Sequence, residues 1–208
     1  MELVFGGSFD PIHLGHLNVI ANLAKTFPSL PIRIVPCSIP ALKSQTGANF
    51  EQRVDMINLS LKPFQQVVID QRENRRDGKS YTVDTLLSLS KEFPERRFVL
   101  VVGADILDSM SQWYRWKTLP KLCHLLVVNR PNYKMDDLAE LTEQLGFSEV
   151  KGIDELMASS NGCYSCLNIE EVDVSSTEIR ENFTNGLSND KFISNDVFNY
   201  INNNLIYK

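Results

Sequence analysis

The chain has 208 residues, of which 43% are hydrophobic, enough for one well-filled core and for a single domain spanning residues 1–208. Its formal net charge of −5 at pH 7 argues against a general nucleic-acid binder, because such proteins usually present a basic surface. The first residues lack the features of a signal peptide and the apolar runs are too short to cross a bilayer, so we expect a cytoplasmic protein that binds no membrane.

Short apolar runs alternate along the chain with stretches of helical periodicity. The runs predict buried strands at Leu3–Phe5, Ile32–Val35, Val67–Ile69, Phe98–Val102, Leu125–Val128 and Leu167–Val172. The expected apolar helix faces are Leu17, Ile20, Ala21 and Ala24, then Phe50, Val54, Ile57 and Leu61, then Val83, Leu86, Leu87 and Ser90. This alternation predicts an α/β fold, a Rossmann-like, doubly wound parallel sheet with a small C-terminal helical part at about 175–208.

The strongest motif follows the first expected strand and reads Gly6-Gly7-Ser8-Phe9-Asp10-Pro11-Ile12-His13-Leu14-Gly15-His16. The two glycines permit a sharp turn and a close approach of the backbone to a ligand. His13 and His16 are three residues apart, so we expect their imidazoles on one face at a helix start, where free N–H groups favour phosphate. The alternatives are a tight turn with two incidental histidines, or a metal pair with Asp10 as its one acidic neighbour. We expect no metal site built by the protein.

A second motif, Val174-Ser175-Ser176-Thr177-Glu178-Ile179-Arg180, follows the expected strand at 167–172. Ser175 and Glu178 have the spacing of a capping box, which predicts another helix N-terminus here. That helix would carry a hydroxyl and a cation on its first turn. From the local pattern alone, a well-capped helix with a solvent-facing Arg180 explains the motif equally well.

The middle of the chain offers groups for a second ligand at the carboxyl ends of strands, where ligands of parallel sheets bind. These groups are Ser80–Leu86, Gly103–Asp105, Trp113-Tyr114 and Asn129-Arg130-Pro131. An indole can stack on a planar ring, backbone N–H groups can bind a carboxylate, and Arg130 can reach a phosphate. The structural alternatives are core aromatics at Tyr81 and Trp113, a helix cap at Asp105 and a surface cation at Arg130.

The first motif resembles the G-x-F-x-P-x-H-x-G-H signature of the nucleotidyltransferase superfamily, and the second resembles its S-S-T-x-I-R motif. With SYTVDTL, GAD, W-Y and N-R-P in between, nearly the whole chain is similar to the bacterial nicotinate-nucleotide adenylyltransferase family. The resemblance implies transfer of AMP from ATP to nicotinate mononucleotide, which gives deamido-NAD and pyrophosphate in NAD biosynthesis. We hypothesise an in-line displacement that needs no protein nucleophile. We expect Mg²⁺ as the cofactor, bridging the polyphosphate, because this acidic chain has few spare cations to neutralise it.

The resemblance further implies which residues act. His13 and His16 would be catalytic. ATP would be bound by Gly6, Gly7, Ser8, Phe9, Lys43, Gly103, Asp105, Ser176, Thr177, Ile179 and Arg180, and the pyridine nucleotide by Tyr81, Thr82, Trp113, Tyr114 and Arg130. One departure from the family stands in Ile39-Pro40-Ala41-Leu42-Lys43, where Leu42 replaces a customary histidine.

Three other functions compete with this interpretation. The first is another adenylyltransferase of the superfamily, with nicotinamide mononucleotide or phosphopantetheine as acceptor, or a related enzyme that uses CTP. The second is a non-catalytic nucleotide sensor, which the retention of both His13 and His16 disfavours. The third is a redox protein that uses Cys163 and Cys166, which we instead interpret as reduced thiols in a loop.

Overall fold

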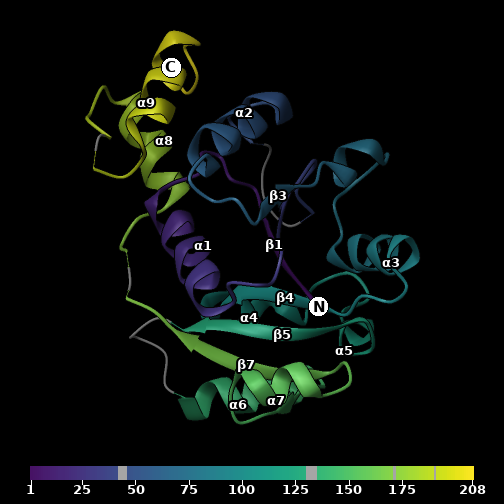
Figure 1. Ribbon diagram of the computed structural model, residues 1–208. Helices are drawn as coiled ribbons and strands as arrows, with labels where there is room; N and C mark the ends of the chain where they lie inside the picture. Colours follow the sequence, from purple (N-terminus) through teal and green to yellow (C-terminus); the bar gives the residue numbers. More distant parts are fainter. Residues whose placement is uncertain (42–45, 130–134, 171, 190) are drawn as a thin grey trace. The chain divides into compact units, whose positions relative to one another are not determined.

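The computed structural model describes residues 1–41, 46–129, 135–170, 172–189 and 191–208 (Figure 1). Its strands are β1 (Glu2–Gly7), β2 (Ile32–Pro36), β3 (Val67–Ile69), β4 (Phe98–Gly103), β5 (Cys123–Asn129), β6 (Ser148–Glu149) and β7 (Cys163–Asn168). Its α-helices are α1 (Leu14–Thr26), α2 (Phe50–Leu61), α3 (Thr82–Glu92), α4 (Ala104–Met110), α5 (Leu119–Leu122), α6 (Met135–Gln144), α7 (Ile153–Ala158), α8 (Ser176–Thr184) and α9 (Asn195–Asn203). Two 3-10 helices, η1 (Arg72–Arg75) and η2 (Trp116–Thr118), complete the described elements.

The strands form one sheet in the order β3-β2-β1-β4-β5-β7-β6. β1 pairs with β4, β4 with β5, β5 with β7, and β7 with β6, each in parallel. Every residue of Phe98–Val102 is at most 5% exposed, as expected for a strand covered on both faces. The chain order changes direction between β1 and β4. The predicted α/β class, with its parallel sheet and C-terminal helices, is confirmed.

The chain folds into two compact units. The first unit comprises Met1–Gly6, Leu30–Arg33 and Ser80–Glu170, and the second comprises Gly7–Ser29, Ile34–Lys79 and Glu171–Lys208. In the first unit, α4 packs on β4, β5 and α6, while α3 packs on α5 and α7 packs on β7. In the second unit, α2 packs against both α9 and β3.

A buried carboxylate joins three segments of the first unit. Glu2 is 0% exposed, and its two carboxylate oxygens accept hydrogen bonds from Arg33 Nε at 2.7 Å and from Arg96 Nη1 at 2.8 Å. A charge removed from water is tolerated only when it is paired, so this carboxylate fixes both arginines beside β1.

The buried helix faces match the sequence pattern in α2 and deviate from it in α1 and α3. All four predicted α2 residues are buried. In α1 the structure buries Leu23 and exposes Ala21, and in α3 it buries Leu89 and leaves Leu87 38% exposed. The expected faces were wrong at these positions because Ala21 and Leu87 lie beside the buried stripe of each helix. That stripe holds Ile20 and Leu23 in α1, and Val83, Thr85, Leu86 and Leu89 in α3.

The strand expected at 167–172 was also misplaced, because the structure has β7 at Cys163–Asn168. β7 pairs with β5 from Leu125↔Tyr164 to Asn129↔Asn168. Only Tyr164 and Ser165 of β7 are buried, so its sequence carries little of the apolar pattern that marks a central strand. The correction moves Cys163 and Cys166 from a loop into a strand. Burial raises the pKa of Cys166 to about 11, which keeps it a thiol rather than a nucleophilic thiolate at neutral pH.

His124 predicts a pH dependence of stability. It is fully buried on β5, and burial together with the nearby Arg97 guanidinium lowers its pKa below the usual 6.5. The unfolded chain therefore takes up a proton near pH 6.5 that the folded chain resists, so the free energy of unfolding falls as the pH drops below about 6.5. Denaturant unfolding at about pH 7.5 and about pH 5 should show this loss. His124→Leu should lose measurably less over the same interval, and an equal loss in both proteins would contradict the assignment.

Candidate active site

The turn after β1 brings the backbone close to an aromatic ring. Gly6 and Gly7 end β1, and a Cβ added at Gly7 would lie 2.9 Å from the Phe9 ring, which would have to shift to admit it. Phe9 adopts a positive φ of 49° and is 1% exposed. Its ring lies 4.9 Å from that of His16, centroid to centroid. Phe9 therefore supports the turn and the second histidine from beneath.

The two histidines share one face at the start of α1, as predicted. His13 is the N-cap residue and is 6% exposed, while His16 is half-buried in the first turn, and their ring centroids are 3.8 Å apart. The His13 backbone N–H donates to Nδ1 of His16 at 3.3 Å. Because Nδ1 accepts, the neutral His16 ring carries its proton on Nε2, where it can donate to a ligand oxygen.

Gly15 makes room for this arrangement. A Cβ added at Gly15 would lie 3.0 Å from the His13 ring and 3.2 Å from Val174. The glycine within H-x-G-H is thus explained by the close approach of the N-cap imidazole to the helix backbone.

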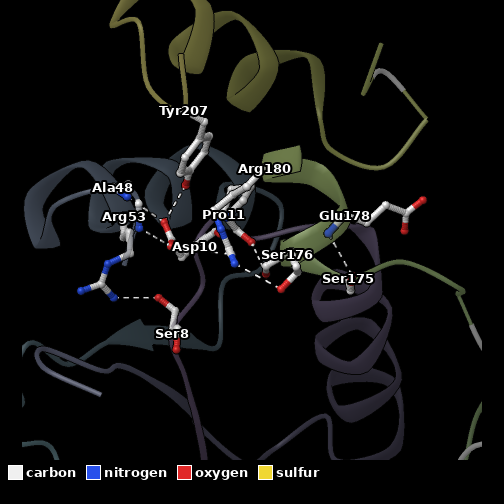
Figure 2. Close-up of polar contacts among 12 residues, drawn as sticks. Ser8, Asp10, Pro11, Ala48, Arg53, Ser175, Ser176, Glu178, Arg180 and Tyr207 are labelled. Atoms are coloured by element: carbon white, nitrogen blue, oxygen red, sulfur yellow. Dashed lines mark hydrogen bonds and ion pairs between the residues drawn. The ribbon is translucent and has the colours of Figure 1, made fainter. Parts of the chain in front are cut away.

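The second motif starts α8 and contacts the first motif directly (Figure 2). Ser175 caps the helix by accepting the Glu178 backbone N–H at 3.1 Å, which confirms the predicted N-terminus. Ser176 Oγ donates to the carbonyl of Pro11 at 3.0 Å, across 165 positions of sequence. Arg180 Nη1 donates to the carbonyl of Asp10 at 2.8 Å. The two motifs recognised in the sequence are therefore one structural site in the second unit.

Other side chains of α8 divide between solvent-accessible and packing positions. Thr177 is exposed, and its Oγ1 accepts a hydrogen bond from Arg180 Nη2 at 3.1 Å. Ser176 is half-buried. Ile179 is 0% exposed and belongs to the packing of the helix. The first-turn N–H groups of α1 and α8 add an electropositive backbone to this region.

Asp10 is a residue of this site whose contacts the sequence analysis did not predict. Its side chain is buried at 3% exposure, and the Asp10–Pro11 peptide bond is cis. The carboxylate accepts from the backbone N–H groups of Gly47 at 2.7 Å and Ala48 at 3.0 Å, and from the Tyr207 hydroxyl at 2.7 Å. No spacing rule links Asp10 to a tyrosine 197 positions away, so the sequence offered no means of finding this pair.

Arg53 is a second residue that sequence reasoning missed. It lies on α2, is 0% exposed, and donates to the carbonyls of Ser8 at 2.7 Å and Ser38 at 3.3 Å. Its guanidinium also lies 5.3 Å from the centroid of the Phe50 ring. Burial lowers the pKa of Arg53, and the nearby Cys37 and Asp10 oppose that shift. The sequence did hold one signal for the burial of Arg53, because this cation lies on the predicted apolar face of α2. A cationic side chain is buried only where partners bind its charge.

The residues expected around a pyridine ring lie in the first unit. Tyr81 precedes α3 and Thr82 begins it. The Tyr81 and Tyr114 rings are in contact, with centroids 4.5 Å apart, and Tyr114 is 51% exposed. Trp113 is half-buried in the turn after α4. The first unit therefore presents an accessible aromatic group, which suits stacking against a planar ligand.

Gly103 and Asp105 lie together where β4 ends and α4 begins. Gly103 is the N-cap residue of α4, and Asp105 stands exposed in the first helical turn. The Asp105 carboxylate occupies the position that a side chain at residue 103 would need, so a larger residue there would displace it. Lys43 and Arg130, with Leu42 beside Lys43, lie outside the described residues.

The described part of the chain shows no group of three or more His, Cys, Asp or Glu residues arranged to hold a metal ion. Within the same ranges, none of the helices combines the length and the apolar character needed to span a membrane.

Comparison with known proteins gives consistent matches over nearly the full length. The profile of the family described as cytidylyltransferase-like matches residues 4–182. The probable nicotinate-nucleotide adenylyltransferase of Shewanella frigidimarina is 31% identical over 207 residues, covering 99% of this chain and 98% of the relative. The protein of the same name from Yersinia enterocolitica is 36% identical over 207 residues, covering 99% and 94%.

A solved structure shares the fold. Plasmodium falciparum nicotinic acid mononucleotide adenylyltransferase, complexed with NaAD, superposes with a TM-score of 0.75 at 20% identity. The match covers 99% of this chain and 96% of that one. At this identity the likeness extends to the fold alone.

The buried Arg53 generates a stability prediction. Arg53→Met should lower the free energy of unfolding by about 1–3 kcal/mol, because the carbonyls of Ser8 and Ser38 lose a charged donor inside the protein. Denaturant unfolding measures the change. Lys62→Met is the matched control, since it breaks an ion pair with Asp196 that is exposed on both sides and should change the value by less than about 1 kcal/mol. Equal effects of the two substitutions would refute a structural role for Arg53.

Proposed function

The chain belongs to the cytidylyltransferase-like family, and we propose that it acts as a nicotinate-nucleotide adenylyltransferase. In this reaction AMP passes from ATP to nicotinate mononucleotide, which yields deamido-NAD and pyrophosphate. The observation that carries the proposal is the full-length similarity to relatives named for this activity. The junction of the two motifs in the second unit supports it, because it brings imidazoles, hydroxyls and a guanidinium to helix N-termini.

The second unit would hold the triphosphate. Nε2 of His16 is a donor suited to phosphoryl oxygens. So are the first-turn N–H groups of α1 and α8, except those of Leu14 and Glu178, which donate to Phe192 and Ser175. Arg180 adds a cation next to Thr177. In our proposal His16 donates to the α-phosphoryl group as charge develops, while His13 contacts the same phosphates from the N-cap position. Gly6, Gly7 and Ser8 would contribute backbone close to the phosphates.

The chemical step needs no group of the protein to bond covalently. An oxygen of the 5′-phosphate of nicotinate mononucleotide attacks the α-phosphorus of ATP. The bond between that phosphorus and the oxygen bridging to the β-phosphate breaks, and pyrophosphate leaves with the electron pair. The chain would contribute orientation and electrostatic stabilisation, which are the main catalytic factors in phosphoryl and nucleotidyl transfer.

The first unit would supply groups for the nucleotides. We propose that Tyr81, Thr82, Trp113 and Tyr114 surround the pyridine ring, and that Gly103 and Asp105 contact ATP. The tilted contact between the Tyr81 and Tyr114 rings and the half-buried Trp113 support an aromatic environment. By family resemblance Arg130 and Lys43 would bind phosphates, and residues 1–208 would act as one nucleotidyltransferase domain.

Magnesium would enter with ATP rather than bind to a preformed cage. Asp10 directs its carboxylate oxygens to protein donors, and the described residues hold no cluster of metal ligands. Mg²⁺ commonly takes its protein-site ligands from substrate phosphates and water, so this chain suits an ion carried by the polyphosphate. When bound there, the ion would neutralise phosphate charge.

The acceptor assignment is tested by pyrophosphate release. Purified protein is incubated with Mg·ATP and, in separate reactions, nicotinate mononucleotide, nicotinamide mononucleotide or phosphopantetheine, with CTP replacing ATP in a parallel set. We expect fast release only with ATP and nicotinate mononucleotide. A preference for another acceptor or for CTP would overturn the substrate assignment. Folded protein that binds ATP but releases no pyrophosphate would support a nucleotide sensor instead.

His16→Ala serves as the control in the same assay. Its turnover should fall on the order of 10²–10³-fold, as expected for the loss of one donor to the transition state. Unchanged turnover would remove His16 from the mechanism without affecting the acceptor assignment.

A further inference from the structure

We infer that Tyr207 is a positioning residue for the ATP phosphates, acting through Asp10 on Arg180. The inference rests on the proposed function, since it assigns Arg180 to the polyphosphate. All three side chains belong to the second unit, and Figure 2 shows the tyrosine hydroxyl directed at the Asp10 carboxylate with Arg180 beside it. Tyr207 itself would touch neither substrate.

The Asp10 carboxylate is almost saturated with donors. Oδ1 accepts from the Tyr207 hydroxyl at 2.7 Å and from the Ala48 N–H at 3.0 Å. Oδ2 accepts from the Gly47 N–H at 2.7 Å and lies 3.7 Å from Arg180 Nη1. Each carboxylate oxygen offers about two acceptor sites, so these three hydrogen bonds leave about one site, and it is on Oδ2, the oxygen nearest Arg180.

Arg180 is hydrogen-bonded to the backbone of Asp10 but forms no close ion pair with its carboxylate. Nη1 donates to the Asp10 backbone carbonyl at 2.8 Å and is only a loose ion-pair partner of the carboxylate. Nη2 donates to Thr177 Oγ1 at 3.1 Å, and the side chain is 31% exposed. The guanidinium therefore keeps donor positions that an incoming phosphate can use. A carboxylate this close is also the natural competitor of a polyphosphate for the same cation.

Packing around its ring and a hydrogen bond to its carbonyl hold Tyr207 where its hydroxyl can donate to the Asp10 carboxylate. Its ring lies against Gly47, where a Cβ would approach to 2.9 Å, and packs near Phe183. The Thr184 hydroxyl donates to the Tyr207 carbonyl at 3.2 Å. Burial and the neighbouring Asp10 carboxylate raise the pKa of Tyr207 above its usual range, so the phenol remains a donor at neutral pH.

Removal of the hydroxyl should redirect Arg180. Without the Tyr207 donor, Oδ1 of Asp10 loses a charge-assisted hydrogen bond, and the carboxylate gains attraction for the nearest cation. Arg180 would then form a tighter ion pair with Asp10 at the expense of the phosphates. This loss would weaken ATP in the ground state and in the transition state alike, which raises KM without lowering kcat.

The test is Tyr207→Phe, which removes one oxygen and preserves the ring packing. We expect the dissociation constant of Mg·ATP, measured by calorimetry without an acceptor, to rise roughly 5- to 20-fold. The KM for ATP should rise by a similar factor, while kcat at saturating substrates should change less than about threefold. The KM for nicotinate mononucleotide should stay within about twofold of the wild-type value.

Tyr200→Phe is a closely matched control. The Tyr200 hydroxyl also donates to a carboxylate, Asp55 of α2, at 2.7 Å, but this bond is exposed to solvent and involves neither Asp10 nor Arg180. It should leave the Mg·ATP affinity within about twofold of wild type. Equal ATP affinities of the two variants would overturn the inference. A Tyr207→Phe chain that fails to fold would also overturn it, because the hydroxyl would then be needed for folding rather than for positioning Arg180.

Failure of the proposed function gives a different result. A wild-type protein that releases no pyrophosphate with any acceptor would refute the enzyme assignment. The ATP affinities of wild type, Tyr207→Phe and Tyr200→Phe, measured by calorimetry, would still show whether Tyr207 contributes to ATP binding.

Discussion

The second unit is organised around the buried carboxylate of Asp10. A charge at 3% exposure must be met by donors, and here they come from Gly47, Ala48 and Tyr207, with Arg180 close by. These groups lie far apart in sequence. The hydrogen bonds to one carboxylate therefore tie together the segment before α2, the first turns of α8 and the segment after α9. The Gly-rich turn after β1 is positioned by the same contacts.

This constraint is compatible with the proposed phosphate site on a mildly acidic chain. The Asp10 carboxylate is buried and accepts hydrogen bonds from protein donors, so it is kept away from the surface that the helix N-termini and Arg180 share. Arg53 supports the turn from the opposite side by binding the Ser8 carbonyl. The two imidazoles then lie on a rigid base, with the His16 proton on Nε2. Preorganised donors of this kind stabilise developing charge without rearrangement during the reaction.

Local signals were sufficient to predict much of this arrangement. The five apolar runs from Leu3 to Val128 all became strands, and the capping spacing of Ser175 and Glu178 marked the start of α8. β7 was misplaced because its pairing with β5, and not its own composition, makes it a strand. The Asp10–Tyr207 bond and the burial of Arg53 depend on tertiary contacts, and no periodicity in a single sequence encodes such contacts.

The central claim is that the chain orients and stabilises a direct transfer without forming a covalent intermediate. The most direct test is the stereochemical course at the α-phosphorus, measured with ATP made chiral at that position and nicotinate mononucleotide as acceptor. A single in-line displacement predicts a dinucleotide product with inverted configuration at phosphorus. Retention of configuration would contradict the account, because it requires two displacements and therefore a nucleophile from the protein.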